Sequence, residues 1–141
     1  MATDLRIVLP DRPGTGTAVC EALAAAGINL EGICGDLRPG EGWGYLHVAI
    51  EDDSVVEDAV RAVESTGCQV VDVHAVDLIP AQNQPGELVK LLGEYRDRGE
   101  NLEVLYVASD NRIVIGTEAQ RKPRHGVRVD QAKYSERPPG L

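Results

Sequence analysis

Two short motifs recur at a fixed distance along this 141-residue chain. In the first copy, Asp11-Arg12-Pro13-Gly14 is followed by Gly27-Ile28-Asn29-Leu30. In the second copy, Asn83-Gln84-Pro85-Gly86 is followed by Gly99-Glu100-Asn101-Leu102. The proline and the later glycine are 14 positions apart in both copies, and the copies are offset by 72 residues. A fixed offset of this kind indicates the internal duplication of one supersecondary unit.

The length of the chain fits one ordinary domain, or two units of about 70 residues that share a core. No apolar run approaches the roughly 20 residues that a membrane-spanning helix needs. The first residues show no signal-peptide pattern. Cys20, Cys34 and Cys68 lack the spacing of a zinc site, which favours reduced, buried thiols. We therefore expect a cytoplasmic protein without membrane partners.

The charge of the chain is −9 and is unevenly distributed. A strongly acidic balance argues against a nucleic-acid-binding protein. Residues 119–141 hold six Lys and Arg residues against two acidic ones, so a basic tail follows an acidic body. Such a tail is expected to lie against that body or against a partner subunit.

Hydrophobic periodicity predicts a complete β-α-β-β-α-β unit in the first copy. A glycine-rich hairpin loop, residues 38–44, separates its two middle strands. Ser54 and Glu57 have the spacing of a capping box that opens the second helix. The expected elements are strand 5–9, helix 15–26, strand 30–37, strand 45–50, a helix from Ser54 to Gly67, and strand 70–79.

The second copy repeats only part of this pattern. Gly86 opens a helix, and two strands at residues 102–108 and 112–116 flank a turn at 109–111. The second helix is missing, so the fourth strand of the first copy is free to serve as the first strand of the second. The helix stripe consists of Leu88, Leu91, Leu92 and Tyr95.

The last two strands of the second copy are apolar on both faces. A sheet covered by helices on one side alternates apolar and polar residues along each strand. Two apolar faces therefore predict a second cover, which we expect another subunit to provide. This pattern predicts a homodimer or a larger assembly.

The strand order, the repeated turn and the segment after the first helix together resemble the ACT domain family, in particular its small stand-alone tandem members. The resemblance implies an α+β, ferredoxin-like fold with a mainly antiparallel sheet and helices on one face. It implies a complete ACT domain at residues 1–79, a truncated ACT-like unit at 73–118, and a basic tail at 119–141.

The resemblance also implies a regulatory protein that binds a free amino acid where ACT units meet. In serine-sensing members, a polar residue two before the proline and the asparagine after the helix hold the ligand. The second copy matches this two-asparagine pattern, whereas Leu9 and Ala81 stand where the family has a histidine, which leaves the amino acid open. The implied ligand-binding residues are Asp11, Arg12, Pro13, Gly14, Asn29, Asn83, Gln84, Pro85, Gly86 and Asn101.

Physical chemistry supports this location. Free N–H groups at the start of a helix attract a carboxylate. A neighbouring amide or carboxylate oxygen can accept a hydrogen bond from an ammonium group. Because the second loop adds no charge, we expect the amino acid there, and we expect Asn101→Ala to weaken binding more than Asn29→Ala.

Each of these residues also has a structural interpretation. The Pro-Gly pairs are common turn formers, Asp11 could cap the first helix, and asparagine tolerates left-handed backbone where a helix ends. Trp43 could be a ligand lid or a contact with a neighbouring subunit. His47, His74 and His125 lack metal-site spacing, so neither a metal nor another cofactor is expected.

Three functions remain in competition. The first is a non-catalytic amino-acid sensor that acts through an unidentified regulated enzyme. The second is a dimerisation or partner-binding module with degenerate ligand sites. The third is an acylphosphatase-like hydrolase, in which Arg12 would hold phosphate, although the glycine-rich cradle of that family is absent. The sequence shows no catalytic constellation, which favours the sensor.

Overall fold

The computed structural model describes residues 2–121. Residues 122–141, which make up most of the predicted basic tail, therefore lie outside the described residues. Among residues 2–121, no helix combines the length and apolarity needed to cross a membrane. The elements are β1 (Ala2–Pro10), α1 (Thr15–Ala25), β2 (Gly32–Arg38), β3 (Trp43–Ile50), α2 (Val56–Glu64), β4 (Gln69–Pro80), α3 (Glu87–Asp97), β5 (Leu102–Val107) and β6 (Arg112–Thr117), with single 3-10 turns at Asp53–Val55 and Glu118–Gln120.

The strands form one six-stranded sheet in the order β2-β3-β1-β4-β6-β5, and every neighbouring pair is antiparallel. The long strand β4 joins its two halves. Its first part pairs with β1, while Asp77 to Pro80 pair with β6. The first-copy order β2-β3-β1 thus recurs as β5-β6-β4, which confirms that β4 serves both copies. The α+β fold is as expected.

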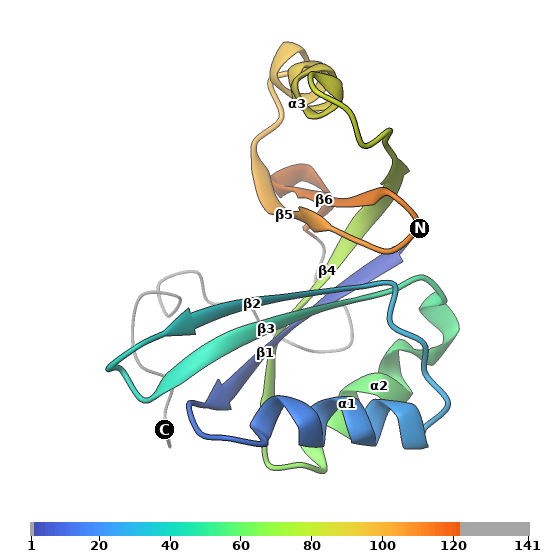
Figure 1. Ribbon diagram of the computed structural model, residues 1–141. Coiled ribbons are helices and arrows are strands. Elements are labelled where there is room, and N and C mark those ends of the chain that lie inside the picture. The colour runs from blue at the N-terminus through green and yellow to red at the C-terminus, as the bar shows by residue number, and fades with distance from the viewer. Residues whose placement is uncertain (1, 122–141) are drawn as a thin grey trace.

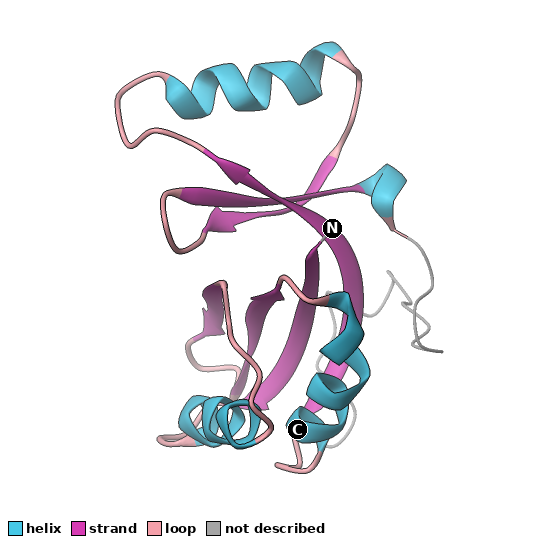
Figure 2. Ribbon diagram, turned by 90° about the vertical axis from the view of Figure 1, so that its right-hand side faces the viewer, coloured by secondary structure: helices cyan, strands magenta, loops and turns pink. Residues whose placement is uncertain are grey.

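The sheet curls until its two edge strands meet at one end. Gly32 of β2 forms an isolated bridge with Ala108, and the Ser109 N–H donates to the Glu31 carbonyl at 2.8 Å. A side chain at Gly32 would come within 3.1 Å of the Ala108 Cβ and of the Tyr106 ring. A glycine is therefore needed where the edges close. Figures 1 and 2 show α1 and α2 outside one half of the curl and α3 outside the other.

The main core lies between the first half of the sheet and helices α1 and α2. Both helices bury an apolar stripe against the strands, as the predicted periodicity requires. All three cysteines are free thiols, but only Cys68 is buried as predicted. The fully buried members of this core include Leu5, Ile7, Val19, Leu23, Val48, Val56, Ala59 and Val63.

A second core fills the inside of the curl, between the two halves of the sheet. Here the Tyr106 hydroxyl donates to the buried Asp4 carboxylate at 2.6 Å, and His47 Nδ1 lies 2.9 Å from its other oxygen. Burial, with the charge of Asp4, raises the pKa of Tyr106. Tyr106 on β5 therefore attaches the second copy to β1 of the first.

This arrangement corrects the interpretation of the last two strands. One apolar face of β5 is covered by the chain's own sheet, because the curl brings Val104 and Tyr106 against the first copy. On the other face, Leu105 is 44% exposed and Val107 is 68% exposed. Only this outer face remains available to another subunit.

The start of α1 at Thr15 is as predicted, but the capping role considered for Asp11 and the predicted start of α2 at Ser54 are wrong. The N-cap of α1 is Gly14, which has no side-chain cap, and Asp11 lies three residues earlier, beyond the reach of a capping side chain. Ser54 does not open α2 either. The Asp52 carboxylate accepts from the Ser54 N–H at 2.9 Å, so a 3-10 turn forms first. An acidic side chain two residues earlier competes with the capping box.

Trp43 is neither a lid nor a contact with another subunit. It belongs to β3 and is only 1% exposed. Its ring lies edge-on to Tyr45, with 5.0 Å between ring centroids, and the Arg38 guanidinium lies 5.1 Å from its centre. The glycine-rich segment is thus a shorter hairpin than predicted, and its aromatic residue packs within the chain.

Candidate functional site

The ten predicted ligand-binding residues are all exposed, and they occupy equivalent places in the two copies. Asp11 to Gly14 precede α1, and Asn83 to Gly86 precede α3. The N-cap glycines, Gly14 and Gly86, share a φ of 90°, and neither helix start has a side-chain cap. The first N–H of each helix donates to a backbone carbonyl, Thr15 to Arg12 at 3.5 Å and Glu87 to Gln84 at 3.4 Å. The N–H groups that follow have no side-chain cap and can bind an anion.

Asn29 and Asn101 follow the other ends of the same helices. Gly27 and Gly99 adopt left-handed φ angles of 71° and 70°. The next N–H, of Ile28 or Glu100, returns to the carbonyl five residues earlier at 3.0 Å. This six-to-one bond defines the same helix ending in both copies.

The structure does not bring the two halves of either predicted site together. Each helix has 11 residues, which at about 1.5 Å per residue is roughly 16 Å. Asp11 precedes α1 and Asn29 follows it, as Asn83 and Asn101 do for α3, so the two members of each pair lie at opposite ends of their helix. The two poles of one amino acid, a few ångströms apart, cannot reach both halves within one copy.

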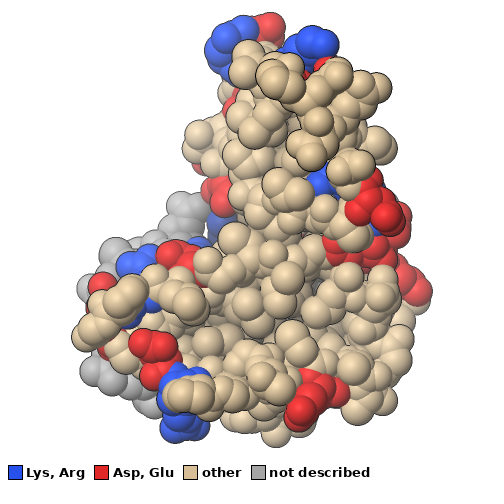
Figure 3. Space-filling view, viewed as in Figure 1, with Lys and Arg blue, Asp and Glu red and all other residues tan. Residues whose placement is uncertain are grey.

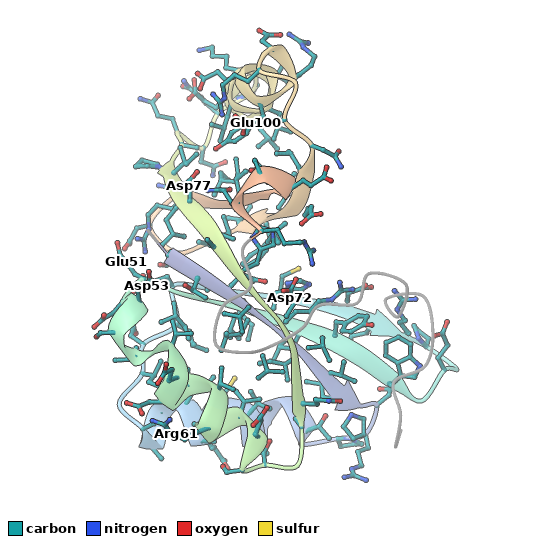
Figure 4. The ribbon with its side chains drawn as sticks, turned by 180° about the vertical axis from the view of Figure 1, so that it is seen from behind. Glu51, Asp53, Arg61, Asp72, Asp77 and Glu100 are labelled. Carbon is teal, nitrogen blue, oxygen red and sulfur yellow. The ribbon has the colours of Figure 1, made fainter. Side chains whose placement is uncertain are left out.

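A pocket of about 300 Å³ opens beside Asn29. It lies where α1 passes into β2 and where β3 passes into the turn before α2. Figure 4 shows Glu51 and Asp53 together at this rim of the molecule. Three carboxylates give the pocket a negative lining. Its residues are Gly27, Ile28, Asn29, Glu31, Ile50, Glu51, Asp52 and Val55.

Glu31 organises this pocket. Its Oε1 accepts from the Asn29 side-chain amide at 2.6 Å. Its Oε2 accepts from the Arg112 guanidinium and from the Ser109 hydroxyl, both in the β5–β6 hairpin. The Arg112 hydrogen bond, ahead of the weaker bonds from Asn29 and Ser109, lowers the pKa of Glu31. A residue of the second copy thus holds the first-copy site in place.

Sequence reasoning missed Glu31, although a signal was present. An Asn-Leu-Glu triplet occurs at 29–31 and again at 101–103. In the second copy the glutamate has different partners. Glu103 accepts from Arg121 at 2.7 Å and contacts His74 Nε2 at 3.0 Å. Burial alone would raise the pKa of Glu103, but these hydrogen bonds lower it overall.

The helix starts also differ in charge. The first turn of α3 contains Glu87, which pairs with Lys90 at 3.0 Å, whereas the first turn of α1 contains no acidic residue. A carboxylate ligand would be repelled by Glu87. The hydrogen bonds of Arg12 are made by its backbone. Within residues 2–121, no group of three His, Cys, Asp or Glu side chains is placed to hold a metal.

Several solved structures share this fold. The regulatory subunit of aspartate kinase from Thermus thermophilus has 21% identity and a TM-score of 0.63, over 82% of both chains. That from Thermus flavus has 21% identity and a TM-score of 0.61, over 84% of this chain and 83% of that one. A protein from Bacteroides thetaiotaomicron has 28% identity and a TM-score of 0.64, over 82% and 76% respectively.

No family model and no curated protein matches the sequence. The structural likenesses extend over most of each chain and include both halves of the sheet. They show that the chain has an ACT-like fold, in agreement with the resemblance of its motifs.

Proposed function

We propose that this chain is a non-catalytic regulatory protein of the ACT family, which binds a free amino acid between ACT-like units. Residues 1–79 form the complete unit in this proposal, and residues 73–118 form the truncated one. The observation that carries it is the duplicated helix start with uncapped N–H groups, on a fold shared with aspartate kinase regulatory subunits. A regulated enzyme is the proposed recipient of the signal.

The binding site is proposed to require two chains. Since the loop at Asp11–Gly14 and Asn29 lie at opposite ends of α1, the proposal requires a two-fold axis beside the middle of α1 and perpendicular to it, which would place the loop of one chain against Asn29 of the other. A symmetric dimer makes two identical sites in this way. The loop offers N–H groups to the carboxylate, and the Asn29 pocket offers oxygen atoms to the ammonium group.

The first copy is the better proposed site, which reverses the sequence-based expectation for the second. Its helix start carries no acidic residue, and Arg12 adds a positive charge beside it. Asn29 lines a pocket, and Glu31 holds its amide. In the second copy, Glu87 opposes a carboxylate, and the bonds of Glu103 go to Arg121 and His74.

The outer surface of the second copy supports assembly with another chain, at a face on α3 and β5 that is separate from α1 (Figure 1). Leu88 and Val89 on α3 are 44% and 76% exposed, and Leu105 and Val107 are exposed on β5. Figure 3 shows a broad uncharged face between the charged top of α3 and the acidic side chains beside the β5–β6 turn. Such a patch is typical of a surface that another protein chain covers.

Thermal unfolding in the presence of each of the twenty amino acids tests the proposal. A ligand that binds only the folded state raises the midpoint temperature of unfolding. At a ligand concentration of about a hundred times Kd, it raises the free energy of unfolding by about 2.7 kcal/mol. We expect one or a few amino acids to raise it. Turnover of acetyl phosphate would instead indicate the hydrolase.

The exposed apolar face also favours a second candidate, a dimerisation or partner-binding module whose ligand sites have lost function. This candidate predicts an assembly that no amino acid stabilises. Light scattering, with and without the amino acids, distinguishes the two, because the sensor should dimerise and also respond.

A further inference from the structure

We propose that Glu31 is a positioning residue that makes Asn29 an acceptor for the ammonium pole of the ligand. This inference rests on the proposed function, since it assigns the polarity of that same site. It begins from a hydrogen bond whose direction is fixed by chemistry. An ionised carboxylate can only accept, so the group that Asn29 directs at Glu31 must be its NH₂.

Hydrogen bonds from neighbouring residues stabilise the ionised form of Glu31. Arg112 and Ser109 occupy Oε2, which leaves Oε1 for Asn29. Both come from the β5–β6 hairpin, and the bridge at Gly32 keeps that hairpin in place. The Asn29 amide is therefore held in one orientation, with its nitrogen toward Glu31 and its oxygen available to a ligand.

The rest of the pocket favours the same pole. Glu51 has a 63% exposed side chain and lies 3.5 Å from Arg112, which it shares with Glu31. The Asp52 carboxylate accepts from the N–H and the hydroxyl of Ser54 through one oxygen. Three carboxylates thus line the pocket, and the Arg112 guanidinium pairs with only two of them, Glu31 and Glu51. A ligand carboxylate would therefore be repelled here, whereas an ammonium group would be attracted.

The carboxylate pole is left to the uncapped start of α1 in the partner chain. The amino acid would therefore bind with its ammonium group on Asn29 and its carboxylate at Gly14. In the second copy, Glu103 is bonded to His74 and Arg121, so Asn101 has no equivalent support. Asn101 serves as the matched control.

The test uses the full-length protein and two minimal probes, methylammonium chloride and sodium acetate, at constant ionic strength. NMR follows the side-chain amide signals of Asn29 and the backbone signals of residues 27–31. Methylammonium should shift these signals and acetate should not. Asn29→Ala should weaken methylammonium binding at least about tenfold, the effect of losing one hydrogen bond to a charged ligand, while Asn101→Ala leaves it unchanged.

A paired exchange separates positioning from mere structural support. Combining Asn29→Asp with Glu31→Gln reverses the internal hydrogen bond but keeps an oxygen for the ligand. This double variant should bind methylammonium within about threefold of the wild type. Asn29→Asp alone places two carboxylates together and should unfold at a lower temperature than the double variant.

Acetate shifting the Asn29 signals, or methylammonium binding that survives Asn29→Ala, would overturn the inference. If amino acids stabilise the protein but methylammonium does not shift the Asn29 signals, the proposed function stands. In that case only the orientation of the ligand, with its ammonium group on Asn29, is refuted. If methylammonium binds at Asn29 and no amino acid stabilises the protein, the polarity stands and the proposed function fails.

Discussion

Helix α1 packs against a second helix, α2, whereas within residues 2–121 α3 has no such neighbour. Leu23 on α1 is fully buried, and its equivalent on α3, Tyr95, is 4% exposed. The next position of the stripe differs more, since Val19 of α1 is fully buried whereas its equivalent Leu91 is only partly buried, and α3 also exposes Leu88 and Val89. The same local sequence plan thus produces a buried helix in one copy and a helix with an open apolar side in the other.

The backbones of the two copies remain alike in spite of this difference. The N–H of residue 18 or 90 bonds to the N-cap carbonyl, at 2.9 Å and 3.1 Å respectively, and the six-to-one bond closes both helices. Repeated glycines and prolines therefore determine helix starts and ends locally. What the repeated side chains contact depends on the neighbouring elements, and Glu31 and Glu103 are the clearest pair.

The largest difference between the copies should appear when a buried apolar residue of α1 and an exposed apolar residue of α3 are truncated. Leu23→Ala removes a fully buried side chain and should lower the free energy of unfolding by about 2–5 kcal/mol. Leu88→Ala, on the exposed side of α3, should cost less than about 1 kcal/mol. Urea unfolding measures both, and equal losses would mean that Leu88 is as deeply buried as Leu23.

The next effect concerns assembly. Leu105→Asp or Val107→Asp puts a charge on the exposed face of β5 and should dissociate the proposed dimer, because a buried unpaired charge is costly. Light scattering at micromolar concentration should show a wild-type mass above 15.2 kDa and a monomer for the variants. Ile33 on β2 is equivalent to Leu105 and is also exposed. Ile33→Asp therefore compares the two edge strands of the sheet, β2 and β5. A monomeric wild type would contradict the dimer.

The ligand comparison follows. Asn29→Ala should weaken amino-acid binding by about 1.5–3 kcal/mol, or roughly 10- to 150-fold, because a hydrogen bond to a charged group is lost. Asn101→Ala should change it less than about threefold. Titration calorimetry with the amino acid identified by thermal unfolding provides both values. The opposite ranking would return the site to the second copy, as the sequence motif alone predicted.

The smallest effect is a dependence of stability on pH. The folded pKa values of Glu31 and Glu103 lie below the ordinary value of 4.5. Their contribution to stability is therefore complete well above pH 4.5 and is lost as the pH falls through the lower folded values. Glu31→Gln and Glu103→Gln should each flatten the acid side of the stability profile, measured by thermal unfolding between pH 3 and 7. An unchanged profile in both variants would refute this account.

The predicted elements came from local signals, and most lie within two residues of the observed ones. Alternation identified β1 and β3, helical periodicity identified α1 and α3, and the truncation of the second copy suggested that β4 serves both copies. The two errors have different causes. Asp52 accepts from the Ser54 N–H that a capping box requires, and Asp11 lies three residues before the N-cap Gly14, too far to cap α1.

The sequence by itself determined the repeat, the ends of α1 and the order of the strands and helices along the chain, because turns and periodicity act over a few residues. Only the tertiary structure decided that the sheet curls, that Tyr106 reaches Asp4, and that Arg112 holds Glu31 beside Asn29. The contacts that join the two copies connect residues that lie 78 to 102 positions apart in the sequence. Twist and closure of the whole sheet set such distances, and no local pattern encodes them.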